Sequence, residues 1–232
     1  PTLGAWQEVY AEEARAAARI ADAEVSSNRR KGPFHGVPFA LKDIVEVEGK
    51  RTAAGCFEWK DRQSTMTAEV AQRLIDAGGI LLGKTKTVEF AMGGWGTNQR
   101  MGTPHNPWDK NVARTPGGSS SGSGVSVASG MVPCAIGTDT GGSVRLPAAF
   151  CGIAGLKTTE GLLPTSGIVP LSHTLDTPGP MARSVADVAV MFDALVGGPT
   201  GVDLNGGVHG IRVGCLPDDE RSGRQPTQLA AS

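Results

Sequence analysis

The sequence predicts an α/β fold with a mainly parallel or mixed β-sheet. Short apolar segments typical of buried strands alternate along the chain with segments that have helical spacing. Glycine accounts for 33 of 232 residues, which indicates many tight turns between these elements. A chain of this length can bury a full core as one domain.

The first half of the chain contains two predicted helices and two predicted strands. Residues 7–25 are rich in alanine and charge with helical spacing, and residues 36–48 are predicted to form a strand followed by a turn. Thr67 is expected to cap a helix that buries one apolar face and ends at residues 78–79. Residues 80–82 then predict a short buried strand.

The same alternation continues in the second half. Residues 125–131 predict a helix of small residues, and residues 134–138 predict a buried strand. Ser184 and Asp187 form a capping box that opens an amphipathic helix ending at Leu195.

Composition narrows the functional classes. The formal net charge is −1, so nucleic acid is not expected as a direct partner. The sequence has no apolar run of 18 residues and no signal peptide, which predicts no membrane association. Four dispersed cysteines without a C-x-x-C pair favour a reducing, cytoplasmic location. We expect one domain over residues 1–217, followed by a polar, irregular tail or truncation point over residues 218–232.

Two glycine-rich turns contain the residues that suggest chemistry. Residues 117–122 (GGSSSG) and 138–143 (TDTGGS) each place serine beside glycine. Acyl transfer needs a nucleophilic hydroxyl and backbone N–H groups that stabilise a developing oxyanion, and both turns offer them. Lys42 is a candidate base for this pair of turns.

Other motif matches compete with this interpretation. Residues 78–85 fit the Walker A pattern of phosphate-binding loops, but such a loop follows a strand, whereas these glycines follow a predicted helix. Residues 118–122 fit the G-x-S-x-G nucleophile elbow centred on Ser120, with Asp176 and His209 downstream, but a polar segment precedes them instead of a buried strand. A flexible linker is disfavoured because apolar sequence follows directly.

Residues 117–159 (GGSSSGSGVSVASGMVPCAIGTDTGGSVRLPAAFCGIAGLKTT) closely resemble the amidase signature family. Two further stretches match the same family in the right order, ALKD at residues 40–43 and LDTPGPMARS at residues 175–184. The resemblance covers residues 34–196, and three ordered motifs are more specific than any one. It implies an amidase that hydrolyses an amide-type C–N bond, with an α/β fold in which helices cover both faces of a central mixed β-sheet.

The family uses a Ser-Ser-Lys triad. The resemblance implies that Ser143 is the nucleophile, that Ser119 is the bridging serine after a cis peptide bond, and that Lys42 is the base. A lysine can accept the proton only when neutral, which burial and a lack of nearby carboxylates favour. Asp43 adjoins Lys42, but successive residues of a strand point to opposite faces, so the two need not pair.

The resemblance also assigns the surroundings of the triad. It implies an oxyanion hole from the backbone N–H groups of Thr140, Gly141, Gly142 and Ser143, an acyl pocket at Gly93, Gly94 and Trp95, and a bracing ion pair between Asp139 and Arg145. The alternative for Trp95 is an aromatic side chain that only packs for stability. The alternative for Asp139 and Arg145 is an ordinary surface ion pair.

The sequence implies no cofactor, and the histidines lack metal-ligand spacing, so no metal is expected. The expected substrate is a small-molecule amide, carbamate or urea-like compound. The resemblance allows a homo-oligomer or a second, different protein as partner, since complete members of the family are longer and use the later part for much of the pocket. Three alternatives stay open: the glutamine-hydrolysing component of a tRNA-dependent amidotransferase, a non-catalytic fragment and a P-loop nucleotide-binding protein.

Overall fold

The structure is a computed structural model that describes residues 3–109 and 111–214. The chain divides into two compact units, Pro1–Val202 and Asp203–Ser232. In the second unit, the described residues 203–214 form turns and irregular backbone. The predicted tail over residues 218–232 and Cys215 lie outside the described residues.

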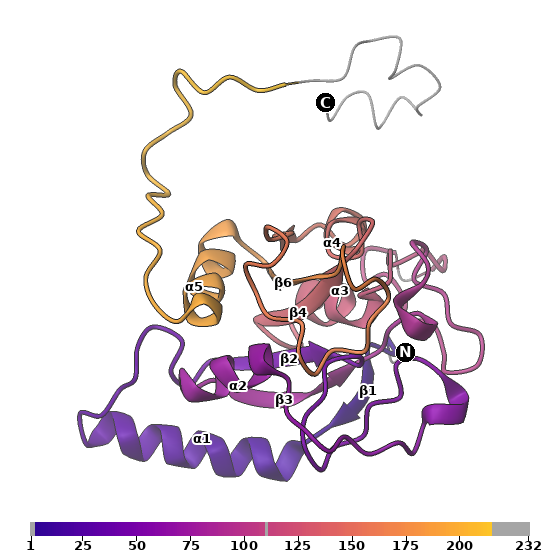
Figure 1. Cartoon of the computed structure of the whole chain (residues 1–232), viewed down its shortest axis with the longest axis horizontal. Coiled ribbons are helices and arrows are strands. Elements are labelled where there is room, and N and C mark those ends of the chain that lie inside the picture. Colours follow the sequence, from indigo (N-terminus) through magenta and orange to yellow (C-terminus); the bar gives the residue numbers. More distant parts are fainter. Residues whose placement is uncertain (1–2, 110, 215–232) are drawn as a thin grey trace. The chain divides into compact units, whose positions relative to one another are not determined.

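A six-stranded mixed sheet organises the first unit, with strand order β1-β3-β2-β4-β6-β5. Figure 1 labels all of these strands except β5. The strands are β1 (Trp6–Val9), β2 (Pro38–Lys42), β3 (Ile80–Thr85), β4 (Cys134–Asp139), β5 (Ala154–Gly155) and β6 (Thr177–Ala182). β2 runs parallel to both β3 and β4, whereas the β1–β3, β4–β6 and β5–β6 pairs are antiparallel. The mixed sheet confirms the predicted fold class.

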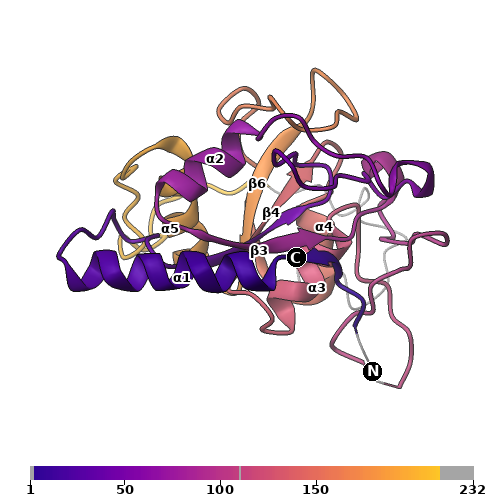
Figure 2. The ribbon, with the colours of Figure 1, turned by 90° about the horizontal axis from the view of Figure 1, so that it is seen from below.

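Helices pack on both faces of this sheet. They are α1 (Ala11–Ser26), α2 (Glu69–Asp76), α3 (Ser121–Ala128), α4 (Arg145–Cys151) and α5 (Val185–Val196), with 3-10 helices η1 (Phe57–Trp59) and η2 (Glu89–Ala91). The main apolar core places α2 and α5 against the face that carries Phe39, Leu41 and Ile136. Alternate residues such as Ala40 and Ala135 point to the other face, toward α3. In Figure 2, α1 and α3 lie below β3 and α2 lies above it.

Several predicted elements have different bounds in the structure. The helix predicted over residues 7–25 begins at Ala11, because residues 6–9 pair with β3 as an edge strand. Thr67 does not cap α2, since the N-cap is Ala68 and the Thr67 hydroxyl accepts a hydrogen bond from the Glu48 N–H at 3.1 Å. The helix predicted over residues 125–131 is α3, which begins and ends earlier.

Other elements match their predictions. β4 coincides with the predicted strand, and α5 begins after Ser184, whose side chain accepts a hydrogen bond from the Asp187 N–H as the capping box predicts. Among the described residues, no helix combines the length and apolar character needed to cross a membrane.

Candidate active site

Lys42 ends β2 and is fully buried. Its Nζ donates hydrogen bonds to Ser119 Oγ at 2.7 Å and to Thr138 Oγ1 at 2.8 Å. Thr138 lies on β4, which pairs with β2, so the sheet itself brings this hydroxyl beside the amine. The structure therefore joins two predicted site residues, Lys42 and Ser119, and adds Thr138, which the sequence did not indicate.

Burial shapes the charge state of this amine. Loss of hydration lowers the pKa of Lys42 from 10.5 to about 7, against the opposing influence of the Asp176 and Asp139 carboxylates. A large fraction of Lys42 is then neutral near pH 7. Asp43 pairs with a different lysine, as its carboxylate lies 3.3 Å from the Lys84 amine.

The Ser119 turn is held by backbone contacts. The peptide bond between Gly118 and Ser119 is cis, as the resemblance implies. The N–H of Gly118 donates to the carbonyl of Gly94 at 2.7 Å, and the carbonyl of Ser119 accepts from the N–H of Val88 at 3.2 Å. A Cβ on Gly118 would lie 2.5 Å from the Gly93 carbonyl oxygen, so this close approach requires glycine.

Ser143 lies on the turn between β4 and α4, nearly buried, with 9% of its surface exposed. Its backbone is close to the other serine turn, because its carbonyl accepts from the N–H of Ser120 at 3.3 Å. Among the described residues, no side chain or backbone group forms a hydrogen bond with the Ser143 hydroxyl. The hydroxyl is thus available to a bound molecule.

The N–H groups of this turn are not equivalent. Gly142 donates to Asp139 Oδ1 at 2.7 Å, so its N–H is already occupied. Within the described part of the chain, the N–H groups of Thr140, Gly141 and Ser143 have no hydrogen-bond partner. These three are the donors left for an oxyanion.

Asp139 and Arg145 form a two-point ion pair beneath this turn. Arg145 Nε lies 3.0 Å from Asp139 Oδ2, and Arg145 Nη2 lies 2.9 Å from Asp139 Oδ1. Burial by itself would raise the pKa of Asp139, but the guanidinium and the N–H donors of Gly142, Val144 and Arg145 lower it to about 2. Because the Asp139 carboxylate is fully buried, this is not an ordinary surface pair.

Asp176 is a second brace, which sequence reasoning considered only as part of a nucleophile elbow. Its Oδ1 accepts a hydrogen bond from the Thr140 hydroxyl. Its Oδ2 accepts from the N–H groups of Leu171 and Ser172 at 2.8 and 3.0 Å. Through these hydrogen bonds, Asp176 links the turn that carries Ser143 to the segment before β6. Its position in the LDTPGPMARS motif was the available signal.

The predicted acyl-pocket residues Gly93, Gly94 and Trp95 lie beside the Ser119 turn. Gly94 accepts the Gly118 hydrogen bond, and Gly93 and Trp95 line an open groove of about 800 Å³. Trp95 is 69% exposed, so in the described chain it is not a packed core aromatic.

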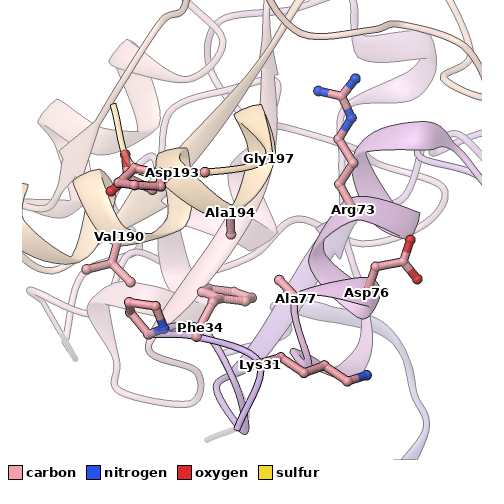
Figure 3. Close-up of a pocket in the computed structure, with 13 residues that line it drawn as sticks. Lys31, Phe34, Arg73, Asp76, Ala77, Val190, Asp193, Ala194 and Gly197 are labelled. Atoms are coloured by element: carbon pink, nitrogen blue, oxygen red, sulfur yellow. The ribbon is translucent and has the colours of Figure 1, made fainter. Parts of the chain in front are cut away.

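A separate cavity of about 500 Å³ lies between α2, α5 and residues 31–34 (Figure 3). Its floor is apolar, with Phe34 and Ala194 pointing into it, and Lys31, Arg73 and Asp76 lie around it (Figure 3). None of the predicted site residues lines this cavity.

One group of described side chains has the composition of a metal site. The ligand atoms of Cys56, Glu58 and Glu89 lie within 4.8 Å of one another. However, Glu58 forms an ion pair with Arg100 and accepts a hydrogen bond from the Cys56 thiol at 3.3 Å. These contacts account for the arrangement, and we assign it no metal.

The structure contradicts the two competing motif interpretations. Residues 83–85 of the Walker A match belong to β3, and Lys84 is buried against Asp43 instead of opening a loop toward solvent. Ser120 is fully buried. Its hydroxyl accepts a hydrogen bond from the Thr138 N–H at 3.2 Å and donates one to the Thr138 carbonyl at 3.3 Å. The described residues from 101 to 118 contain no strand that could precede an elbow.

Comparison with known proteins shows the family of the chain. The family model described as amidase matches residues 1–201. The chain belongs to the amidase family. A glutamyl-tRNA(Gln) amidotransferase subunit from Anaeromyxobacter sp. (strain K) is 43% identical over 95% of this chain and 47% of that protein. The 2-amino-5-chloromuconic acid deaminase of Comamonas testosteroni is 44% identical over 92% of this chain and 47% of that protein.

Solved structures of this amidase family share the fold. The native peptide amidase of Stenotrophomonas maltophilia is 38% identical with a TM-score of 0.77, over 83% of this chain and 40% of that chain. A chain from a vestigial protein complex, linked to the evolutionary origins of an s-triazine catabolic enzyme, is 39% identical with a TM-score of 0.80, over 83% of this chain and 42% of that chain. The chain thus spans about half the length of the curated relatives it matches.

Proposed function

We propose that this amidase-family chain hydrolyses the C–N bond of an amide through an acyl-serine formed on Ser143, with Ser119 as the proton relay and Lys42 as the base. The observation that carries this proposal is the 2.7 Å separation between the buried Lys42 Nζ and Ser119 Oγ, across which the Ser119 hydroxyl donates to the amine once the amine is neutral. A lysine whose pKa is about 7 can accept a proton at neutral pH, which an exposed lysine cannot.

The proposed reaction begins when substrate brings the Ser143 hydroxyl into hydrogen-bonding distance of Ser119. The proton of Ser143 passes to Ser119 while the Ser119 proton passes to neutral Lys42, and Ser143 Oγ bonds the carbonyl carbon. The N–H groups of Thr140, Gly141 and Ser143 stabilise the oxyanion, and loss of one such donor typically costs ~10²–10³ in turnover. As the C–N bond breaks, Lys42 returns the proton to the leaving nitrogen. Water then cleaves the acyl-serine by the same route.

The proposed substrate is a small-molecule amide, carbamate or urea-like compound. A second candidate is glutamine hydrolysis within a tRNA-dependent amidotransferase. The 43% identity to the Anaeromyxobacter amidotransferase protein favours this candidate, while the 44% identity to 2-amino-5-chloromuconic acid deaminase favours a small-molecule substrate. In the amidotransferase case the chain would act with a partner protein.

The extent of the domain and its location belong to the same proposal. Residues 1–217 would form the N-terminal part of an amidase signature domain, which the family match over residues 1–201 supports. A cytoplasmic location rests on the cysteine pattern of the sequence.

The proposal is tested by measuring ammonia or amine release from aliphatic, aryl and dicarboxylic amides, carbamates, urea and glutamine. We expect the wild-type chain to hydrolyse at least one class and Ser143→Ala to lose that activity. Ser120→Ala should retain most of it, because the Ser120 hydroxyl bonds backbone groups. Equal activity of wild type and Ser143→Ala would contradict the proposal, and inactivity of the wild-type chain on every class would favour a non-catalytic fragment.

A further inference from the structure

Leu146 on α4 lies between two parts of the proposed site. Its Cδ1 is 3.1 Å from where a Cβ on Gly94 would lie, and its Cγ is 3.1 Å from where a Cβ on Gly142 would lie. Gly94 belongs to the predicted acyl-pocket segment, and Gly142 precedes Ser143 in the chain. One side chain therefore contacts both the acyl-pocket segment and the turn that carries the nucleophile.

The position of Leu146 is fixed by its helix. Its N–H donates to the carbonyl of Gly142 at 2.7 Å, so the first turn of α4 holds the residue over the Ser143 turn. One turn later, Phe150 comes close to Gly117, where an added Cβ would lie 2.8 Å from its Cδ2. Both residues are at least about one-third exposed, at 36% for Leu146 and 39% for Phe150. Leu146 and Phe150 thus form a solvent-exposed apolar border beside the two serine turns.

Space for a substrate remains beside this border. A Cβ on Gly141 would meet no atom within 4 Å, and Gly141 also has one of the free N–H groups. A carbonyl held by that N–H would place its acyl substituent near the apolar side chain that spans Gly142 and Gly94. Contact with a branched aliphatic side chain favours small apolar groups and excludes large ones by steric overlap.

From these contacts we propose that Leu146 is a specificity-determining residue that limits the size of the acyl group delivered to Ser143. The inference rests on the proposed function, because it takes Ser143 as the nucleophile. It predicts that shortening this side chain opens the space between Gly94 and Gly142, and that enlarging it closes that space.

The test compares p-nitrophenyl acetate with p-nitrophenyl benzoate, which deliver a small and a bulky acyl group to the same serine with the same leaving group. In Leu146→Ala, we expect the benzoate-to-acetate ratio of kcat/KM to rise at least about tenfold, since a single methylene group in an apolar pocket typically changes discrimination by ~10–200-fold. In Leu146→Phe the ratio should fall. Ile20→Ala, an exposed aliphatic truncation on α1, is the matched control and should leave the ratio unchanged.

The possible outcomes separate the two claims. Ester hydrolysis that persists in Ser143→Ala would overturn the proposed function, and the inference with it. Hydrolysis that depends on Ser143, with the same ratio in wild type, Leu146→Ala and Leu146→Phe, would overturn the inference about Leu146 alone. A ratio that rises in both variants, or falls in both, would also contradict the inference, because a smaller side chain must raise the ratio and a larger one must lower it.

Discussion

At the scale of single residues, the site depends on the buried amine of Lys42. Among the described residues, Lys42 donates hydrogen bonds only to the hydroxyls of Ser119 and Thr138, whereas Lys84, which is also buried, pairs with Asp43. Burial disfavours the charged form of both amines, but in the described part of the chain Lys42, unlike Lys84, has no bonded carboxylate that would restore its charge. This difference separates a candidate base from a structural ion pair.

The pKa of Lys42 predicts the pH dependence of turnover. Only the neutral amine accepts a proton, so kcat/KM should rise as pH increases through about 7 and level off above it. The Asp176 carboxylate favours the charged ammonium, so Asp176→Asn should lower the pKa of Lys42 and move the midpoint of the rise to lower pH. Asp22→Asn on α1 serves as the control and should leave the midpoint in place. A flat or acid-favouring wild-type profile would count against Lys42 as the base.

The residue roles differ in how far the sequence could predict them. The serines and glycines of both turns are local features, so their position on turns followed directly from the sequence. The hydrogen bond between Lys42 and Ser119 joins residues 77 positions apart and depends on how the sheet assembles. Only the family resemblance could connect them. Thr138 and Asp176 were missed because their roles come from contacts across β4 and the segment before β6.

At the scale of elements, β4, the Ser143 turn and α4 act as one unit. Asp139 ends β4, and its carboxylate accepts from the N–H groups of Gly142, Val144 and Arg145, so it organises the turn and the start of the helix. Since the Gly142 N–H serves this purpose, it is not free to bind substrate. Within this turn, the Gly142 N–H therefore stabilises the structure, while the N–H groups of Thr140, Gly141 and Ser143 are the proposed oxyanion donors.

The capping box of α5 gives a prediction about stability. Ser184 Oγ accepts from the Asp187 N–H at 3.1 Å, so Ser184→Ala should lower the free energy of unfolding by about 1 kcal/mol in urea titration. Ser184→Asn, which keeps a capping acceptor, should stay near the wild-type value. If the two variants lose equal stability, the side chain of Ser184 does not act as a cap.

Two strands, β1 and β6, were the hardest to predict. β1 lies at the edge of the sheet, has no continuous apolar run and takes its strand conformation from pairing with β3, so the local pattern there favours a longer helix. β6 lies inside the sheet and is buried throughout, but its sequence TPGPMA contains two prolines and a glycine, which do not indicate a strand. β4 is also buried throughout, and its apolar residues predict it correctly. Local pattern therefore identifies a buried strand of apolar residues, whereas β1 and β6 required the tertiary structure.

At the scale of the whole molecule, the sheet topology brings the residues of the proposed site together at one edge of the sheet. β2 and β4 are adjacent and parallel, so the carboxyl ends of both strands lie at the same edge of the sheet. Lys42 ends the first strand, and the Ser143 turn follows the second. The turn of Ser119 joins them through its hydrogen bond to Lys42. The parallel pairing therefore places the proposed base and nucleophile at the same edge of the sheet.

The central claim is that Ser143 is the nucleophile of this assembly. A fluorophosphonate probe tests it directly, because the attacking serine forms a bond to phosphorus and releases fluoride. After reaction of the wild-type chain, peptide mapping by mass spectrometry should find the adduct on Ser143, and Lys42→Ala should lose it. An adduct on Ser120, or labelling that is unchanged in Ser143→Ala, would contradict the claim.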